Sequence, residues 1–393
     1  MSLKKILAPL RNVVLPVEDE CLRLTVRPGR TNPFRILLMR FDFIGDFVLW
    51  LDAAKELRRH FQKGKYEITL IGNDLWTDFA ASSPNFDHVW PLNRKSFLNN
   101  PVYRFSVMKR VREAGFGVAI NPTFSREFLV GDSIIHASEA PRRIGWVGDL
   151  SNIKPWQKKI SDYWYTELVR SSDQSMMELE RNAEFIRGLG IASFQASLPE
   201  LPPLSAQTWI DRKYFVLAPG ASWSGRHWSL DSFTSIANKL QKKTGWIPVI
   251  VGSSSEIVLG LELEKLLTPE ANCKNLVGKT SVSEMLSVIA SSSFVFGNET
   301  AAVHCAAAAR VPSVCVLGGG HFGRFLPYRL ASSSDSSHQF YPTALFRKMD
   351  CFGCNWNCIY EHPPDAAVPC ISAITVDEVW RTIETSLETI HDS

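Results

Sequence analysis

Apolar and polar positions alternate along this chain in blocks that predict strands followed by helices. Short apolar runs end in Gly, Asn or Pro, and most are followed by segments with apolar residues three or four positions apart. In the first half the predicted strands cover residues 34–41, 67–73, 88–92, 116–122 and 142–148, and a predicted helix at 177–190 closes it. Alternating strands and helices favour a parallel sheet with helices on both faces.

The pattern stops near residue 195 and then restarts. SLPELPPLSAQTW is rich in Pro and Ser and has no periodicity, which is typical of a linker. The predicted organisation is an N-terminal extension at 1–33, an α/β domain at 34–200, a linker at 201–213, a second α/β domain at 214–375 and a C-terminal helix at 376–393 that packs back near the junction. Ligands of such sheets bind at the carboxyl ends of the strands, so we expect a site in a cleft between the domains.

Composition narrows the classes of function. The 393 residues are more than one core usually covers, and 45% hydrophobic with 21% charged residues is typical of a globular protein. A net charge of +3 does not favour nucleic acid as a partner, and no apolar run is long enough to span a membrane. The basic N-terminal segment is either a helix lying on a membrane surface or, as we favour, a packed terminal helix. We expect a cytoplasmic protein, with peripheral contact at the inner face of the cytoplasmic membrane as the alternative.

Four of the eight cysteines cluster near the C-terminus, at Cys351, Cys354, Cys358 and Cys370. Their spacing departs from the paired Cys-x-x-Cys pattern of common zinc sites. A metal site, a disulfide and a group of packed free thiols remain open for this cluster, and we assign no metal.

The segment GNETAAVHCAAAARV at 297–311 predicts a helix directly after a strand. One interpretation is an ordinary capped helix, with Thr300 or Asn298 as the cap. The other is a site for an anion such as a diphosphate, because free N–H groups and the positive end of the helix dipole meet there.

Three further loops after predicted strands carry candidate chemistry. Ser222 and Arg226 lie in a Gly-bearing loop, and Arg forms bidentate bonds to phosphate. Gly319 and Gly320 allow backbone N–H groups to turn toward an anion. Asp46 follows Gly45 at a strand–helix junction, where it is either a first-turn carboxylate or a general base.

Several common nucleotide motifs are missing. The loop at 40–50 lacks the G-x-G-x-x-G spacing of a dinucleotide site, which counts against a dehydrogenase, and the absence of a P-loop lysine motif counts against a kinase. No Asp-x-Asp pair lies in a metal-binding loop. We therefore expect phosphate charge to be stabilised by the helix dipole, arginine and hydroxyl groups rather than by magnesium.

The order and spacing of these motifs resemble glycosyltransferase family 9, the group that includes lipopolysaccharide heptosyltransferases. The resemblance rests on RFDFIGD at 40–46, RRIGW at 142–146, APGASWSGRHWS at 218–229 and GNETAAVHCAAAARVPSVCVLGGG at 297–320. It implies a GT-B fold, in which two Rossmann-like domains with parallel sheets face an interdomain cleft. It also implies transfer of a heptose from ADP-heptose, with inversion and without a required cofactor, to a lipopolysaccharide or other surface glycan.

The resemblance implies roles for individual residues. Asp46 matches the catalytic base. Ser222 and Arg226 match positions near the diphosphate where relatives often have Thr and Lys, and Glu256 matches a carboxylate that contacts the nucleoside. The remaining matches, at the phosphate-binding helix, are Glu299, Thr300 and His304. The chain departs from the family there, because Glu299 replaces an Asp and Ala301 replaces a Gly, which alters the floor of the donor pocket.

The acceptor is expected in the first domain. Arg126, Arg142 and Arg143 either meet an anionic glycolipid or are solvated surface charge. Two other functions remain open: a GT-B sugar-nucleotide epimerase, and a non-catalytic protein that binds sugar nucleotides or glycans. The Gly45–Asp46 pair argues for catalysis.

Overall fold

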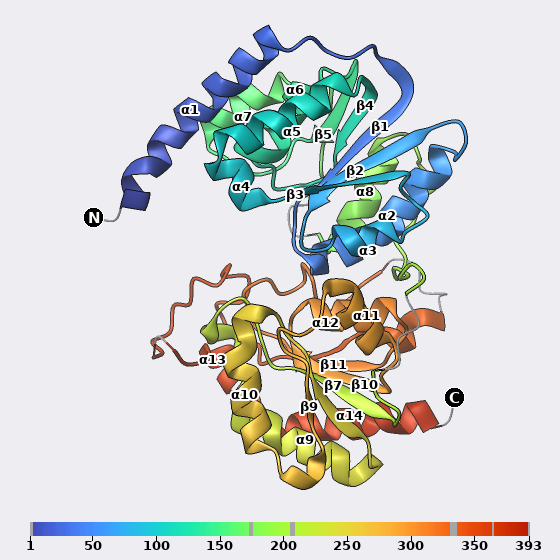
Figure 1. Cartoon of the computed structure of the whole chain (residues 1–393). Helices are drawn as coiled ribbons and strands as arrows, with labels where there is room; N and C mark the ends of the chain where they lie inside the picture. Colours follow the sequence, from blue (N-terminus) through green and yellow to red (C-terminus); the bar gives the residue numbers. More distant parts are fainter. Residues whose placement is uncertain (1–2, 173–175, 205–208, 331–335, 364, 392–393) are drawn as a thin grey trace. The chain divides into compact units, whose positions relative to one another are not determined.

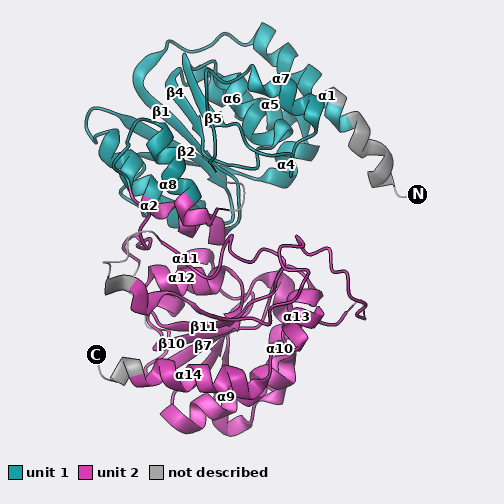
Figure 2. Ribbon diagram, turned by 180° about the vertical axis from the view of Figure 1, so that it is seen from behind, with its two compact units in different colours: residues 1–43, 53–174, 181–194 teal, residues 44–52, 175–180, 195–393 magenta. Residues whose placement is uncertain are grey.

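The computed structural model describes residues 3–172, 176–204, 209–330, 336–363 and 365–391 (Figure 1). Residues 205–208 of the predicted linker lie outside this set. The chain forms two compact units (Figure 2). Unit 1 comprises residues 1–43, 53–174 and 181–194, and unit 2 comprises residues 44–52, 175–180 and 195–393.

Unit 1 is built on a six-stranded sheet in which every neighbouring pair is parallel. Its strands are β1 (Asn32–Arg40), β2 (Glu67–Asn73), β3 (His88–Leu92), β4 (Phe116–Asn121), β5 (Arg142–Trp146) and β6 (Glu167–Val169), in the order β3-β2-β1-β4-β5-β6. The helices of this half are α1 (Leu3–Thr25), α2 (Ile44–His60), α3 (Thr77–Ala81), α4 (Arg94–Asn99), α5 (Pro101–Glu113), a π-helix (Phe128–Asp132), α6 (Ser133–Ser138), α7 (Pro155–Asp162) and α8 (Glu178–Gly188).

Unit 2 repeats this plan with a second parallel sheet. Its strands are β7 (Tyr214–Ala218), β8 (Ile247–Ile250), β9 (Lys274–Asn275), β10 (Phe294–Asn298), β11 (Ser313–Val316) and β12 (Thr343–Leu345), in the order β12-β11-β10-β7-β8-β9. Its helices are α9 (Leu230–Thr244), α10 (Ile257–Leu266), α11 (Val282–Ala290), α12 (Ala301–Ala308), α13 (Pro369–Ser372) and α14 (Val376–His391).

Both sheets have the same doubly wound topology. Counted within each unit, the strand order is third, second, first, fourth, fifth, sixth. The direction of winding reverses between the first and fourth strands, and ligands of such sheets bind outside the strand ends at that reversal. The prediction of two parallel α/β halves is confirmed, and in unit 2 the reversal lies between β7 and β10.

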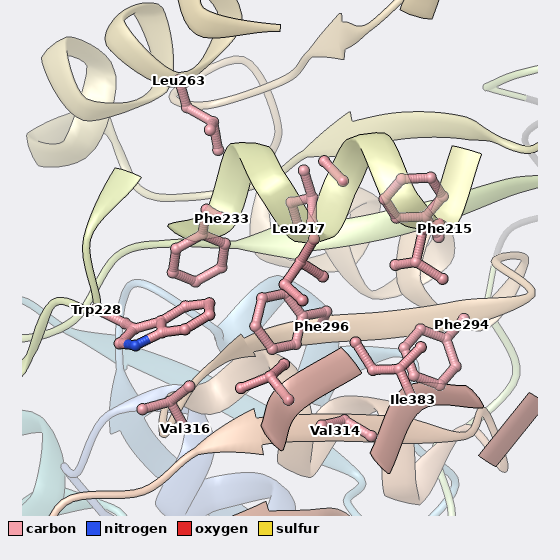
Figure 3. Packing of buried hydrophobic residues seen from close by; sticks show 14 of the residues in the cluster. Phe215, Leu217, Trp228, Phe233, Leu263, Phe294, Phe296, Val314, Val316 and Ile383 are labelled. Atoms are coloured by element: carbon pink, nitrogen blue, oxygen red, sulfur yellow. The ribbon is translucent and has the colours of Figure 1, made fainter. Parts of the chain in front are cut away.

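Buried aromatic residues hold unit 2 together (Figure 3). Phe296 of β10 packs against Phe233 of α9, with ring centroids 4.9 Å apart, and against Trp228 at 5.8 Å. α14 adds Val379, Ile383 and Leu387 to the same cluster. Since the central strands are covered on both faces, they read in the sequence as continuous apolar runs rather than alternating ones.

The elements absent from the prediction are short and lie outside the apolar pattern. β6 and β12 have three residues each, lie at sheet edges, and contain no fully buried residue. The π-helix, α6 and α7 occupy segments to which the apolar pattern assigns neither a strand nor a helix. Their formation depends on packing, because isolated helices of this length are unstable in water.

The N-terminal helix α1 packs on unit 1, as favoured from the sequence. Leu15 and Leu22 are buried, and Asp19 accepts two hydrogen bonds from the fully buried Arg104, at 2.7 and 2.5 Å. Within the described residues, no helix has the length and apolar composition needed to cross a bilayer.

Candidate functional site

A buried amide joins the two strand ends at the reversal point of unit 2. β7 continues into the loop at 219–229, and β10 ends at Asn298. The side chain of Asn298 donates to the carbonyl of Pro219 at 2.6 Å and accepts from the backbone N–H of Trp228 at 3.2 Å. With 1% of its surface exposed, Asn298 fixes this loop against the start of α12.

Arg226 brings three of the predicted donor-site residues together. It ends a short 3₁₀ turn, Ser224–Arg226. Its guanidinium donates to the carbonyl of Glu299 at 2.8 Å, to the Glu299 carboxylate at 3.2 Å and to Ser222 Oγ at 3.0 Å. It also lies 4.6 Å from the centre of the Trp356 ring, so both charge and stacking hold it in place.

The N-terminus of α12 is not capped by either candidate residue. Thr300 occupies the N-cap position, but its side chain makes no capping hydrogen bond. The side chain of Asn298 bonds to the loop at 219–229 instead. The capped-helix interpretation is therefore wrong for both residues, and an anion site at the first-turn N–H groups stays a prediction.

Burial controls the charges around this helix end. It raises the pKa of Glu299 to about 7, and the nearby Arg226 only partly opposes this. Burial, with Arg226 as a second cause, lowers the pKa of His304 to about 4. His304 is therefore neutral at pH 7, and its Nδ1 lies 2.8 Å from the hydroxyl of the buried Tyr328.

Glu256 lies beside the same strand ends. A Cβ atom added to Gly220 would be 1.6 Å from Glu256 Oε1, so any other residue at 220 would displace this carboxylate. The other carboxylate oxygen, Oε2, accepts from Ser253 N at 2.6 Å and from Ser253 Oγ at 2.7 Å. Glu256 is thus held beside the loop after β7, and its contact with the nucleoside stays a prediction.

The glycines after β11 pack against the cysteine-rich segment. Gly319 N–H donates to Cys370 Sγ at 3.4 Å. Added Cβ atoms would collide with Phe352 at Gly319 and with Trp356 at Gly320, at 2.4 and 2.3 Å. Close aromatic packing accounts for both glycines, and the N–H of Gly319 already has a partner, so their role toward an anion stays a prediction.

The four clustered cysteines converge in space. All eight cysteines of the chain are free thiols. Cys351, Cys354, Cys358 and Cys370 line one cavity of about 10 Å³. Over the described part of the chain, no group of three or more His, Cys, Asp or Glu side chains is placed to hold a metal ion. The four clustered cysteines are therefore free thiols that pack around one cavity and form no disulfide.

Asp46 lies in the first turn of α2, and residues 44–52 at the start of this helix belong to unit 2. The preceding Gly45 lies on α12: a Cβ atom there would be 3.4 Å from Ala301 Cα and 3.7 Å from His304 Cδ2. The half-buried Asp46 therefore follows directly on the residue that touches the candidate anion site. Its role as a base stays a prediction.

The three arginines considered for the acceptor have structural partners in unit 1. Arg126 is 1% exposed and contacts the carboxylates of Asp132 and Asp162, so it is not solvated surface charge. Arg142 forms two hydrogen bonds with Glu167, at 2.6 and 2.9 Å. Arg143 donates to two backbone carbonyls, each at 2.5 Å. Their role toward an acceptor stays a prediction.

The sequence does not predict the roles of two residues of this site, Asn298 and Trp356. Asn298 is predicted from the sequence only as a helix cap, whereas in the structure it ends β10 and bonds to the loop after β7. Trp356 lies within the CNWNC segment and has a positive φ of 62°, like Asn355 at 50°. This conformation is unfavourable for residues with a side chain, and nothing in the sequence indicates that it places Trp356 on Arg226.

Comparisons with known proteins agree with this fold. Residues 104–354, more than half of the chain, match the family model described as glycosyltransferase family 9 (heptosyltransferase). Lipooligosaccharide heptosyltransferase 2 of Haemophilus influenzae is 28% identical over 111 residues, which are 28% of this chain and 32%, about a third, of that relative.

Solved structures of similar proteins cover nearly the whole chain. The E. coli ADP-heptose lipopolysaccharide heptosyltransferase II has a TM-score of 0.68 and 16% identity, with 91% of this chain and 99% of that chain covered. E. coli heptosyltransferase WaaC with ADP-2-deoxy-2-fluoro heptose has a TM-score of 0.62 and 15% identity, with 89% and 99% covered. The two α/β units are thus the two domains of a GT-B fold, and the chain belongs to glycosyltransferase family 9.

Proposed function

We propose that this protein is an inverting glycosyltransferase that moves a heptose from ADP-heptose onto a lipopolysaccharide or other surface glycan. Family membership supports the reaction class. The ADP-heptose donor is supported by one similar structure that is named as an ADP-heptose transferase and by another that was solved with an ADP-heptose analogue. The acceptor is inferred from the name of the curated relative.

The observation that carries the proposal is an anion cradle, formed by Ser222, Arg226 and the first turn of α12. Arg226 is already oriented by Ser222, Glu299 and Trp356, so little side-chain entropy is lost when it binds a phosphate. The positive end of the α12 dipole faces the same place. These groups stabilise a departing diphosphate without a metal ion.

The reaction is a single displacement at the anomeric carbon. The acceptor oxygen forms a bond to this carbon while the bond to the diphosphate breaks, and ADP leaves with the bonding electrons. The acceptor proton passes to the carboxylate of Asp46 as the new bond forms. Arg226 and the helix end stabilise the negative charge that develops on the leaving group.

Calorimetry tests this assignment directly. ADP, GDP, UDP and dTDP are titrated into the full chain in the presence of EDTA, and we expect tight binding of ADP only. Binding of a different nucleotide would overturn the ADP-heptose donor while leaving the transferase. No binding of any nucleotide would overturn the anion cradle and favour a non-catalytic glycan-binding protein. Epimerised donor formed without an acceptor would identify an epimerase.

Glu299 makes ADP binding depend on pH. With its pKa at about 7, it is mostly neutral at pH 6 and mostly a carboxylate at pH 8, when it repels a diphosphate bound at Arg226. We expect ADP affinity to fall by about three- to tenfold from pH 6 to pH 8. In Glu299→Gln this fall should be absent, as measured by calorimetry at matched ionic strength, because deprotonation of ADP only adds negative charge that favours binding at Arg226. Equal pH dependence in both proteins would contradict this role.

The same group affects folding stability with a defined sign. Because burial raises the pKa of Glu299, the folded state holds its proton more tightly than the unfolded state. This contribution to stability is complete below the ordinary value of 4.5 and is lost as pH rises toward 7. Glu299→Gln should therefore be stabilised relative to the native chain at pH 8 but not at pH 4.

A further inference from the structure

A second cavity, of about 360 Å³, lies in unit 1, among segments that follow the ends of three strands. Arg94 follows β3, Glu127 follows β4 and residues 150–154 follow β5. α1 and the π-helix complete the lining. Beneath it, Leu15, Phe128, Leu129 and Ile153 form a small apolar cluster that holds α1 in place.

Positive charge exceeds negative charge along this cavity. Arg11, Arg94 and Lys154 line it, and Glu127 is the one carboxylate among the described lining residues. Glu127 pairs with Arg94 at 2.5 Å, and burial raises the pKa of its carboxyl. Asp149 lies next to the lining residue Leu150 and bonds to Ser151.

Two of the three cations lack a counter-charge. Neither Arg11 nor Lys154 forms an ion pair with a described carboxylate, and Arg11 Nε is buried without a hydrogen-bond partner. A buried donor without a partner is costly, so the cavity favours a ligand that supplies oxygen acceptors and negative charge.

Exposed apolar side chains lie in the lining of this cavity and along the adjoining segment of α7. Leu150 is itself a lining residue and is 55% exposed. Trp156 and Ile160 lie on α7 and Tyr163 is its C-cap residue. Their intervals of four and three residues place them on one face, with 46%, 44% and 81% exposed. The Trp156 ring contacts Phe128, another lining residue, at a centroid distance of 5.8 Å. Exposed Lys159 lies on the same helix.

Exposed Trp and Tyr beside cations are typical of a surface that meets lipid headgroups. We propose that this face, formed by the cavity, residues 150–154 and α7, docks on a bilayer that carries anionic phospholipids. A headgroup phosphate enters the cavity between Arg11 and Lys154, and Trp156, Ile160 and Tyr163 enter the interfacial region. The proposal goes beyond the transfer reaction and needs no assumption about the acceptor.

Vesicle sedimentation tests the proposal on the full chain. Vesicles of phosphatidylcholine alone are compared with vesicles containing about a third phosphatidylglycerol, at low and high salt. We expect binding to the anionic vesicles that weakens with salt. Arg11→Gln combined with Lys154→Gln should lower this binding about 25-fold, since each cation near an anionic surface contributes about fivefold. Arg11→Lys with Lys154→Arg should retain it.

Variants of the apolar face separate docking from simple charge attraction. Trp156→Ser with Ile160→Ser should weaken binding to anionic vesicles without changing its salt dependence. The matched control, Val258→Ser with Leu261→Ser, alters exposed apolar residues of α10 in unit 2 and should bind like the native chain. Unchanged ADP affinity and thermal melting in every variant exclude misfolding and keep this test independent of the proposed reaction.

Two outcomes would overturn the proposal. One is equal binding to both kinds of vesicle, or full binding by the Gln and Ser variants. The other is a native chain that is a dimer in solution and a variant at Trp156 and Ile160 that is a monomer. That result would make a second copy of the chain the occupant of this face.

Discussion

Replacing Asp46 by Asn is expected to lower the rate of sugar transfer by about 10²- to 10⁴-fold, the range ordinarily contributed by a general base. Asparagine has nearly the same shape but cannot take the acceptor proton. ADP affinity should stay within about twofold of the native value, because Asp46 is not part of the anion cradle. A group that acts only in the transition state affects kcat rather than donor binding. Initial rates with a saturating donor and calorimetry with ADP measure the two quantities.

The same change elsewhere provides the control. Asp78 is an exposed carboxylate in the first turn of α3, so Asp78→Asn removes a charge at a comparable helix position. Its transfer rate should equal that of the native protein. If Asp46→Asn also retains the native rate, the assignment of the base is wrong. If instead it loses ADP affinity in proportion to its rate, Asp46 acts in donor binding.

Replacing Arg226 by Ala is expected to weaken ADP binding by about 10- to 100-fold, which corresponds to about 1.5–3 kcal/mol for hydrogen bonds to a charged group. The guanidinium links Ser222 to Glu299 beside the first turn of α12, where the diphosphate is proposed to bind. The change also removes the cation that opposes the raised pKa of buried Glu299. Thermal melting and calorimetry with ADP record the two effects separately.

A double variant separates binding from folding. Arg226→Ala combined with Glu299→Gln removes the buried acid along with its partner, so it should recover much of the lost thermal stability. It should not recover ADP affinity, because the phosphate contact is still missing. Arg347→Ala is the matched control, since Arg347 pairs with Glu378 on α14 and contacts no part of the cradle in the described structure. Native ADP affinity in Arg226→Ala would contradict the cradle.

Much of the fold follows from local patterns in the sequence. The central strands of both sheets are buried on both faces, so they appear as apolar runs such as those at 34–41 and 293–297. The alternation with helices predicts parallel sheets, and the Ala-rich segment predicts α12 almost to its ends. Four candidate residues follow strands in the sequence, which indicates that they meet at one sheet edge: Ser222, Arg226, Glu256 and Glu299. The structure shows this for Arg226, which bonds to both Ser222 and Glu299.

Other features of the molecule depend on contacts between distant segments. The edge strands β6 and β12 are too short to show a pattern, and they form because a neighbouring strand offers unpaired backbone groups. The partners of Arg126 and the position of Trp356 on Arg226 join residues 6 to 130 positions apart. Likewise, Arg11 and Lys154 line one cavity only because α1 packs beside the π-helix.

The sequence by itself therefore determined the two parallel α/β domains, the family resemblance and the strand-end positions of the candidate site, because these depend on short-range periodicity and motif spacing. Tertiary structure alone decided which polar groups are buried, which charges are paired and which surface keeps unpaired cations beside exposed aromatic side chains. Burial and pairing depend on the whole set of neighbours around a group, and no local pattern in the chain records that set.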